Sequence, residues 1–227
     1  MSISARAVAA RCAAAAALAS AALIASPPAN AEGLNGLFSI APGSCVGSPQ
    51  GSYFRMILPA GGEDGPFLGN SDSPCGDNTV TPLAPGTDGG LITGKYQPQP
   101  AAPFARNGDA TAGTVTRPVR FYGVLFATST NQTDPQTKEQ TALPVINRDG
   151  NTLSGDLSAF AVTWNNQVFN QGAPKPGGDL PGHTTPVKGV IDTNGNYTLT
   201  WTSQIVSGPF DGFTGLWHLQ GHFGGSR

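Results

Sequence analysis

The feature that most constrains the fold is the alternation of apolar and polar residues near the C-terminus. In segment 197–206, Tyr197, Leu199 and Trp201 occupy every second position, with threonines between them. Successive side chains point to opposite faces of a β-strand, so a period of two predicts a strand with one buried face. Segment 213–223 carries a similar pattern of large apolar residues. These segments predict a pair of half-buried strands.

Short turn sequences separate such segments elsewhere in the chain. Asn-Gly and Asp-Gly favour the tight turns of β-hairpins, because both residues accept positive φ angles there. Two predicted hairpins follow: one joins 187–192 to 197–206 through Asn194-Gly195, and one joins 144–148 to 152–166 through Asp149-Gly150.

Other predicted strands are 34–40, 53–58, 91–96 and 117–128. The last is apolar on both faces, which is typical of a central strand covered on both sides. The intervening stretches 59–89, 97–112, 130–139 and 170–186 are rich in glycine, proline and polar residues, and predict loops. No helical periodicity follows the N-terminal segment. The chain is therefore expected to be all-β, with a single antiparallel β-sandwich or flattened β-barrel over residues 32–227.

The N-terminus has the organisation of a secretory signal peptide. Arg6 and Arg11 precede a small, apolar run from Cys12 to Ala25, and Ala29-Asn30-Ala31 supplies an A-x-A cleavage site. The run is shorter than the roughly 20 residues that span a bilayer. We expect a signal helix cleaved after Ala31, no transmembrane anchor in the mature chain, and a location outside the cell or at its envelope.

Cysteine content and charge agree with export. Cleavage leaves Cys45 and Cys75, and two thiols in an oxidising compartment most simply form one disulfide. The full chain has a formal net charge of −2, and its basic residues are scattered singly. This balance argues against a nucleic-acid partner, whose phosphates attract clustered basic residues.

Few residues form a pattern that indicates catalysis. Asp211, His218 and His222 are the candidate acid–base groups of an extracellular hydrolase or isomerase. His218 and His222 are four strand positions apart, about 13 Å, which is too far for one shared metal ion. Asp192–Asn196 and 147–156 hold several side-chain oxygens, but hairpin turns explain them more simply than calcium sites. No cofactor or metal is predicted. The hypothesis that the protein is an enzyme stays open, but the sequence favours a protein without catalytic activity.

The segment Trp164–Gln171 is the candidate ligand surface. It interleaves two aromatic rings with the amides of Asn165, Asn166, Gln167, Asn170 and Gln171. An aromatic face stacks on a sugar ring, while amides donate to and accept from hydroxyl groups. A glycan or cell-wall component is the more specific ligand. The alternative is that Trp164 and Phe169 are core residues and that the amides bind turn backbone.

The C-terminal sequence also resembles a family. The run Thr200–Ile205, the turn Gly208-Pro209-Phe210 and the stretch Phe213–Leu219 are similar to a group of exported, β-rich actinobacterial proteins with no assigned activity. The resemblance implies an exported single-domain protein and transfers no functional residue. The sequence thus predicts an exported, non-catalytic binding protein, with a hydrolase or isomerase and a structural surface protein as alternatives.

Overall fold

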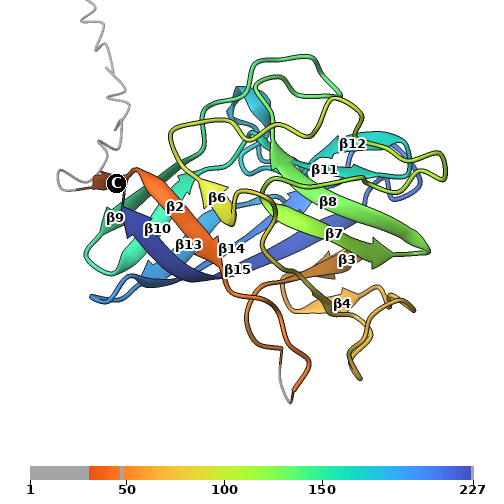
Figure 1. Ribbon diagram of the computed structural model, residues 1–227, viewed down its shortest axis with the longest axis horizontal. Coiled ribbons are helices and arrows are strands. Elements are labelled where there is room, and N and C mark those ends of the chain that lie inside the picture. The colour runs from red at the N-terminus through yellow and green to blue at the C-terminus, as the bar shows by residue number, and fades with distance from the viewer. Residues whose placement is uncertain (1–30, 47–48, 226–227) are drawn as a thin grey trace, which may run out of the picture.

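The computed structural model describes residues 31–46 and 49–225, and their fold is all-β (Figure 1). The predicted signal peptide, 1–31, lies outside the described residues except for Ala31. In the described part, the one helical element is a short 3-10 turn, η1, at Pro176–Gly178. That part contains no helix long and apolar enough to cross a membrane. The predicted all-β, antiparallel class is confirmed.

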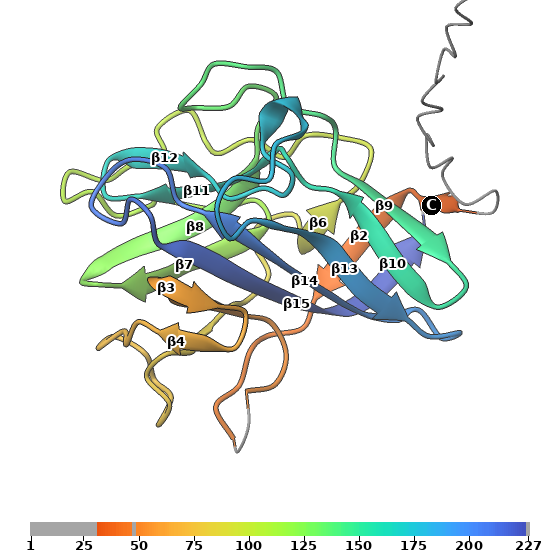
Figure 2. The same ribbon diagram turned by 180° about the vertical axis from the view of Figure 1, so that it is seen from behind.

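The larger sheet is antiparallel and curls along its length (Figure 2). Its main path is β1 (Glu32–Leu34), β9 (Val145–Asp149), β10 (Thr152–Asp156), β13 (Thr185–Ile191), β14 (Asn196–Gln204), β15 (Thr214–Gly225), β2 (Gly36–Ile40) and β6 (Gly90–Ile92). Three more strands branch from β15: β3 (Tyr53–Gly62), with β4 (Gly65–Phe67) and β5 (Thr81–Pro82) beside it. Strand β15 reaches both groups because its first half pairs with β3 and its second half with β2.

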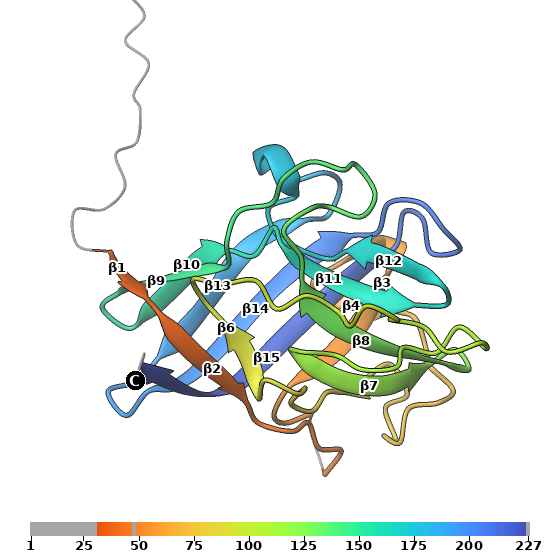
Figure 3. The ribbon, with the colours of Figure 1, turned by 45° about the horizontal axis from the view of Figure 1, so that its top comes forward.

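The smaller sheet has the order β12 (Gln167–Asn170), β11 (Phe160–Trp164), β8 (Val124–Thr130) and β7 (Thr116–Phe121). It lies over the part of the larger sheet formed by β14, β15 and β3 (Figure 3). Phe160 crosses the gap, with its ring centroid 5.1 Å from Trp201 and 5.0 Å from Trp217. The hydrophobic core therefore fills the space between the two sheets.

The period-two pattern at the C-terminus is confirmed. Tyr197, Leu199 and Trp201 are buried on the inner face of β14, while Thr198 and Thr200 between them are half-buried. The predicted turn closes the β13–β14 hairpin, and Asp192 Oδ1 accepts hydrogen bonds from the backbone N–H groups of Asn194 and Asn196. Burial of one face thus fixes the register of these strands.

The prediction of one central strand over 117–128 was wrong. The segment forms the β7–β8 hairpin, which turns at Tyr122 (φ 51°) and Gly123 (φ 77°). Positive φ angles at both central positions are the signature of a tight hairpin turn, and here an aromatic residue takes the position where Asn or Asp is usual. The apolar residues on both faces belong to two paired strands, of which β7 is an edge strand.

Other segments also differ from the prediction. The predicted strand 91–96 extends only to Ile92, the end of β6. Residues 152–166 are two strands, β10 and β11, which belong to different sheets, and the chain crosses between the sheets at 157–159. The predicted loop 59–89 contains β4, β5 and the end of β3. In 152–166 a continuous run of strand-like sequence conceals the crossing between sheets, which depends on tertiary packing. In 59–89 the strands β4 and β5 are too short and too rich in glycine and proline to give an alternating pattern.

The Cys45–Cys75 disulfide is confirmed. The two Cα atoms lie 5.0 Å apart, and 30 positions separate the cysteines in the sequence. The bridge joins the segment that follows β2 to the segment between β4 and β5. It links two stretches whose backbone makes few strand contacts.

Candidate functional site

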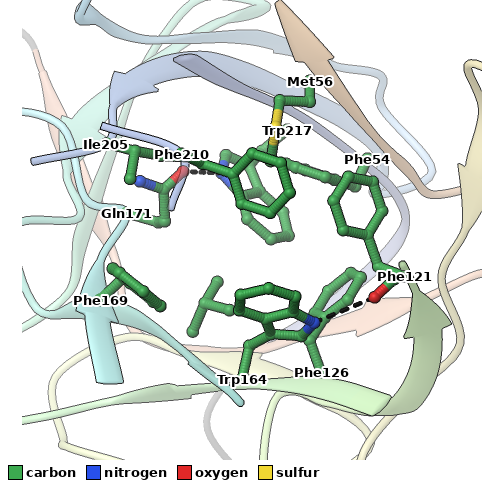
Figure 4. A pocket seen from close by; sticks show the side chains of 11 residues that line it. Phe54, Met56, Phe121, Phe126, Trp164, Phe169, Gln171, Ile205, Phe210 and Trp217 are labelled. Atoms are coloured by element: carbon green, nitrogen blue, oxygen red, sulfur yellow. Dashed lines mark hydrogen bonds between the residues drawn. The ribbon is translucent and has the colours of Figure 1, made fainter. Parts of the chain in front are cut away.

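An apolar pocket lies between the sheets, beside the β11–β12 turn and the β14–β15 loop (Figure 4). Its cavity volume is about 40 Å³. Seven aromatic side chains line it: Phe54, Phe121, Phe126, Trp164, Phe169, Phe210 and Trp217. Met56, Val162, Ile205 and Gln171 complete the wall. An apolar wall with a few polar groups is the usual lining of a small-molecule site, but this cavity is smaller than such sites usually are.

Strand alternation brings these rings together. Phe54 and Met56 point inward from β3, and Trp217 does so from the neighbouring β15. The ring of Phe54 lies edge-on to Phe121 and to Phe126, at 5.6 Å in both cases. Edge-to-face pairs of this kind are preferred because the positive ring edge meets the negative ring face. The pocket wall is thus a preformed aromatic cluster.

Gln171 is the polar residue of the wall. Its Oε1 accepts a hydrogen bond of 3.2 Å from the Trp217 indole N–H, and its Nε2 donates one of 3.0 Å to the Asn170 carbonyl. Its own carbonyl accepts 2.9 Å from the Trp201 indole N–H. A glutamine amide has two donors and two acceptor lone pairs. In the described part of the chain, one donor and one lone pair remain for another partner.

Trp164, predicted as part of a ligand surface, lines this pocket. Its side chain is 8% exposed, and its indole N–H donates 3.0 Å to the carbonyl of Phe121. The bond holds the ring so that it faces the inside of the pocket (Figure 4). Its ring centroid lies 5.4 Å from that of Phe210. The ring is therefore available from within the pocket rather than from the outer surface.

The predicted amides occupy two different places. Asn165 (φ 48°) and Asn166 (φ 59°) form the exposed turn between β11 and β12, and Gln167 is exposed next to them. Gln167 also faces Gly208 of the β14–β15 loop, where a Cβ would meet Gln167 Oε1 at 2.9 Å. Asn170 is buried. The structure thus places three of the five predicted amides at the exposed turn beside the pocket and two, Asn170 and Gln171, in the interior.

Phe210 lies on the more exposed side of the pocket, which we call its mouth. It is the half-buried member of the wall; the other ten side chains are buried. It sits in the loop between β14 and β15, which turns through positive φ angles at Ser207, Gly208 and Gly212. The loop is held by a Ser207 N–H bond to Asp211 Oδ1 (2.5 Å) and by bonds from the Gln136 side chain to Val206 and Ser207.

A buried lysine lies behind Gln171. Lys175 Nζ donates 2.8 Å to the Asn170 carbonyl and 2.8 Å to Ser203 Oγ. Burial lowers the pKa of Lys175 to about 7, while the charge of Asp134 acts in the opposite direction. The Asn170 carbonyl therefore accepts from both Lys175 and Gln171, and it connects the lysine to the pocket wall.

The predicted acid–base residues have separate partners. Asp211 is exposed and binds the Ser207 backbone. His218 stacks on Tyr53, with centroids 4.8 Å apart, and burial lowers its pKa. His222 is exposed, and its Nε2 lies 2.8 Å from the Asn194 carbonyl. The structure brings no two of them into direct contact.

The predicted ligand segment contributes Trp164, Phe169 and Gln171 to the pocket wall, but the sequence pattern did not indicate the other eight wall residues. The sequence predicts only strands for Phe54, Phe121 and Phe126, and only a turn for Phe210. The available signal was the number of aromatic residues at inward positions of 53–58, 117–128 and 213–223. That signal does not show which rings meet, because the pairing of the two sheets is a tertiary property.

Comparison of the chain with protein-family models, curated proteins and solved structures gave no match. Within the described residues, no group of three or more His, Cys, Asp or Glu side chains is placed to hold a metal ion.

Proposed function

We propose that the protein is an exported binding protein and that it holds a small, largely apolar molecule in the pocket between its two sheets. The observation that carries the proposal is the wall itself. Seven aromatic rings and one amide surround a space beside the exposed β14–β15 loop. Buried apolar surface gives a ligand most of its binding energy, and a few polar groups give it orientation.

Export is supported by the N-terminal sequence and the disulfide. The charged start, the apolar run and Ala29-Asn30-Ala31 follow the order of a secretory signal. The Cys45–Cys75 bridge suits an oxidising compartment. On this proposal the mature protein acts at the cell envelope or outside the cell.

The position of Trp164 favours an apolar ligand over a glycan. A sugar-stacking platform needs an exposed ring face, whereas Trp164 is 8% exposed and faces inward. The exposed amides of Asn165, Asn166 and Gln167 would contact only the part of a ligand that extends from the mouth. A glycan ligand remains a prediction, tested by comparing wild type with Asn166→Ala on a cell-wall glycan panel.

The pocket proposal is tested with a substitution that fills the cavity. Val162→Ile adds one methylene group to the wall and keeps a β-branched residue in β11. Wild type and variant are screened by thermal shift against a panel of small uncharged compounds. Val190→Ile is the matched control, because Val190 is 56% exposed and lies away from the wall.

The proposal predicts that some compounds raise the melting temperatures of wild type and Val190→Ile. The same compounds should raise the melting temperature of Val162→Ile by a smaller amount. A panel without a single stabilising compound would contradict it. So would compounds that stabilise all three proteins equally, because their site would then lie elsewhere. The melting temperatures without ligand show that the variants are folded.

A further inference from the structure

The cavity is too small for a ring as it stands. Its volume is about 40 Å³, whereas a cavity that takes benzene measures about 150 Å³. A ring-sized ligand therefore enters only if a wall residue moves. Ten of the eleven wall residues are buried in the sheets or next to them, and Phe210 is the half-buried one, carried by a loop.

Phe210 itself sits among aromatic rings. Its ring centroid lies 5.7 Å from Phe121, 5.5 Å from Tyr122, 5.4 Å from Trp164 and 5.6 Å from Phe213. Three of these four pairs are edge-to-face. A phenyl ring from the chain thus already occupies an aromatic position at the mouth.

We infer that Phe210 is an internal plug, and that the ligand carries an uncharged aromatic ring which takes its place. The inference rests on the proposed function and specifies its ligand. When the loop moves outward, the vacated position adjoins the existing cavity and offers ring edges and faces on several sides. Ligand ring and Phe210 then compete for the same contacts.

The wall selects against charge. None of its eleven side chains is ionisable, and Gln171 is its one polar residue. An ionised group buried there would lose its hydration without gaining a counter-charge. A hydroxyl group suits the site better, because Gln171 retains one donor and one lone pair beyond its bonds to Asn170 and Trp217.

Four compounds of similar size separate these properties. Benzyl alcohol is uncharged and aromatic, benzoate is an anion, benzylammonium is a cation, and cyclohexylmethanol is uncharged without an aromatic ring. Calorimetric titration of the full mature chain is expected to give the lowest dissociation constant for benzyl alcohol, by at least about tenfold over the two ions.

A second experiment removes the Phe210 ring and measures the affinity for benzyl alcohol. A competing internal group reduces the fraction of binding-competent protein, so its removal lowers the apparent dissociation constant. Phe210→Ala is expected to bind benzyl alcohol at least about fivefold more tightly than wild type. Phe223→Ala is the matched control: Phe223 packs on Phe38 at 4.7 Å and is not part of the wall. Phe210→Leu replaces Phe210→Ala if the latter does not fold.

The outcomes separate the inference from the function on which it rests. If an ion or cyclohexylmethanol binds more tightly than benzyl alcohol, the proposed ligand class is wrong, but the proposal that the pocket holds a ligand stands. Weaker binding to Phe210→Ala than to wild type shows that Phe210 covers the ligand, and it overturns the plug. Failure of all four compounds to bind wild type and the Phe210 variant overturns the inference, whereas the cavity-filling screen decides the function independently.

Discussion

The indole N–H of Trp217 donates a hydrogen bond of 3.2 Å to Oε1 of Gln171 within the wall of the aromatic pocket. Both residues are buried. The bond satisfies the Trp217 donor, and the Gln171 amide bonds to Asn170 in turn. The bond connects the aromatic wall to the interior polar groups around Lys175. We therefore expect a change at Gln171 to affect the stability of the fold as well as the pocket.

Gln171→Leu should destabilise the protein. The variant keeps a side chain of similar size but leaves the Trp217 N–H without its acceptor, and an unsatisfied buried donor costs about 1–3 kcal/mol. The free energy of unfolding in urea measures the loss. Gln140→Leu is the control, because Gln140 is exposed and should change stability by less than about 0.5 kcal/mol. Equal stability of Gln171→Leu and wild type would show that the bond contributes nothing.

Stability should rise with pH because of Lys175. The pKa of Lys175 is about 7 in the folded protein and 10.5 in the unfolded chain. Between these values the unfolded state binds more protons, so the free energy of unfolding increases with pH. From pH 7.5 to 9.5 the increase is about 2–3 kcal/mol, because the slope is at most 1.36 kcal/mol for each unit. The range ends below pH 10 because burial raises the pKa of Tyr197, whose ionisation in the unfolded chain opposes the trend.

Lys175→Met isolates this contribution. Urea unfolding at several pH values should give a nearly flat profile for the variant over that range, because its side chain does not titrate. Lys188→Met is the control: Lys188 is exposed and pairs with Glu63, so its variant should keep the slope of wild type. An unchanged slope in Lys175→Met would contradict the account of the buried lysine.

Gly123→Ala should cost about 1–2 kcal/mol, because Gly123 has a φ of 77° and an L-residue is strained there. A Cβ at Gly123 meets nothing within 4 Å, so the effect isolates backbone conformation. Gly62 is the matched control: its Cβ position is equally open, and its φ lies outside the positive range. Thermal melts of Gly123→Ala and Gly62→Ala compare the two. Equal melting temperatures would show that the β7–β8 turn adapts without strain.

Loss of the disulfide should destabilise the fold. A loop of 30 positions corresponds to about 3–4 kcal/mol on the chain-entropy account. The double variant Cys45→Ser, Cys75→Ser should therefore unfold at lower urea concentration than wild type, and reductant should lower the midpoint of wild type only. A wild-type midpoint that reductant does not change would show that the bridge adds no stability.

Local patterns predicted the fold class, and tertiary contacts decided the rest. The inward positions of Tyr197, Leu199 and Trp201 followed from alternation alone, since one face of β14 is buried. The turn at Tyr122-Gly123 was not predicted, because tyrosine seldom adopts a positive φ. Trp164 stood out in the sequence as an aromatic residue among amides, whereas the place of Phe210 in the pocket wall depends on a loop that packs against the other sheet.

The most direct test of the pocket is the indole N–H spectrum of the ¹⁵N-labelled protein during titration with benzyl alcohol. The chain has three tryptophans, of which Trp164 and Trp217 line the pocket and Trp201 does not. A ligand between the sheets should shift the Trp164 and Trp217 signals progressively and by more than the Trp201 signal. Three signals that stay in place at saturating benzyl alcohol, or a shift confined to Trp201, would contradict a site for this aromatic ligand in the pocket.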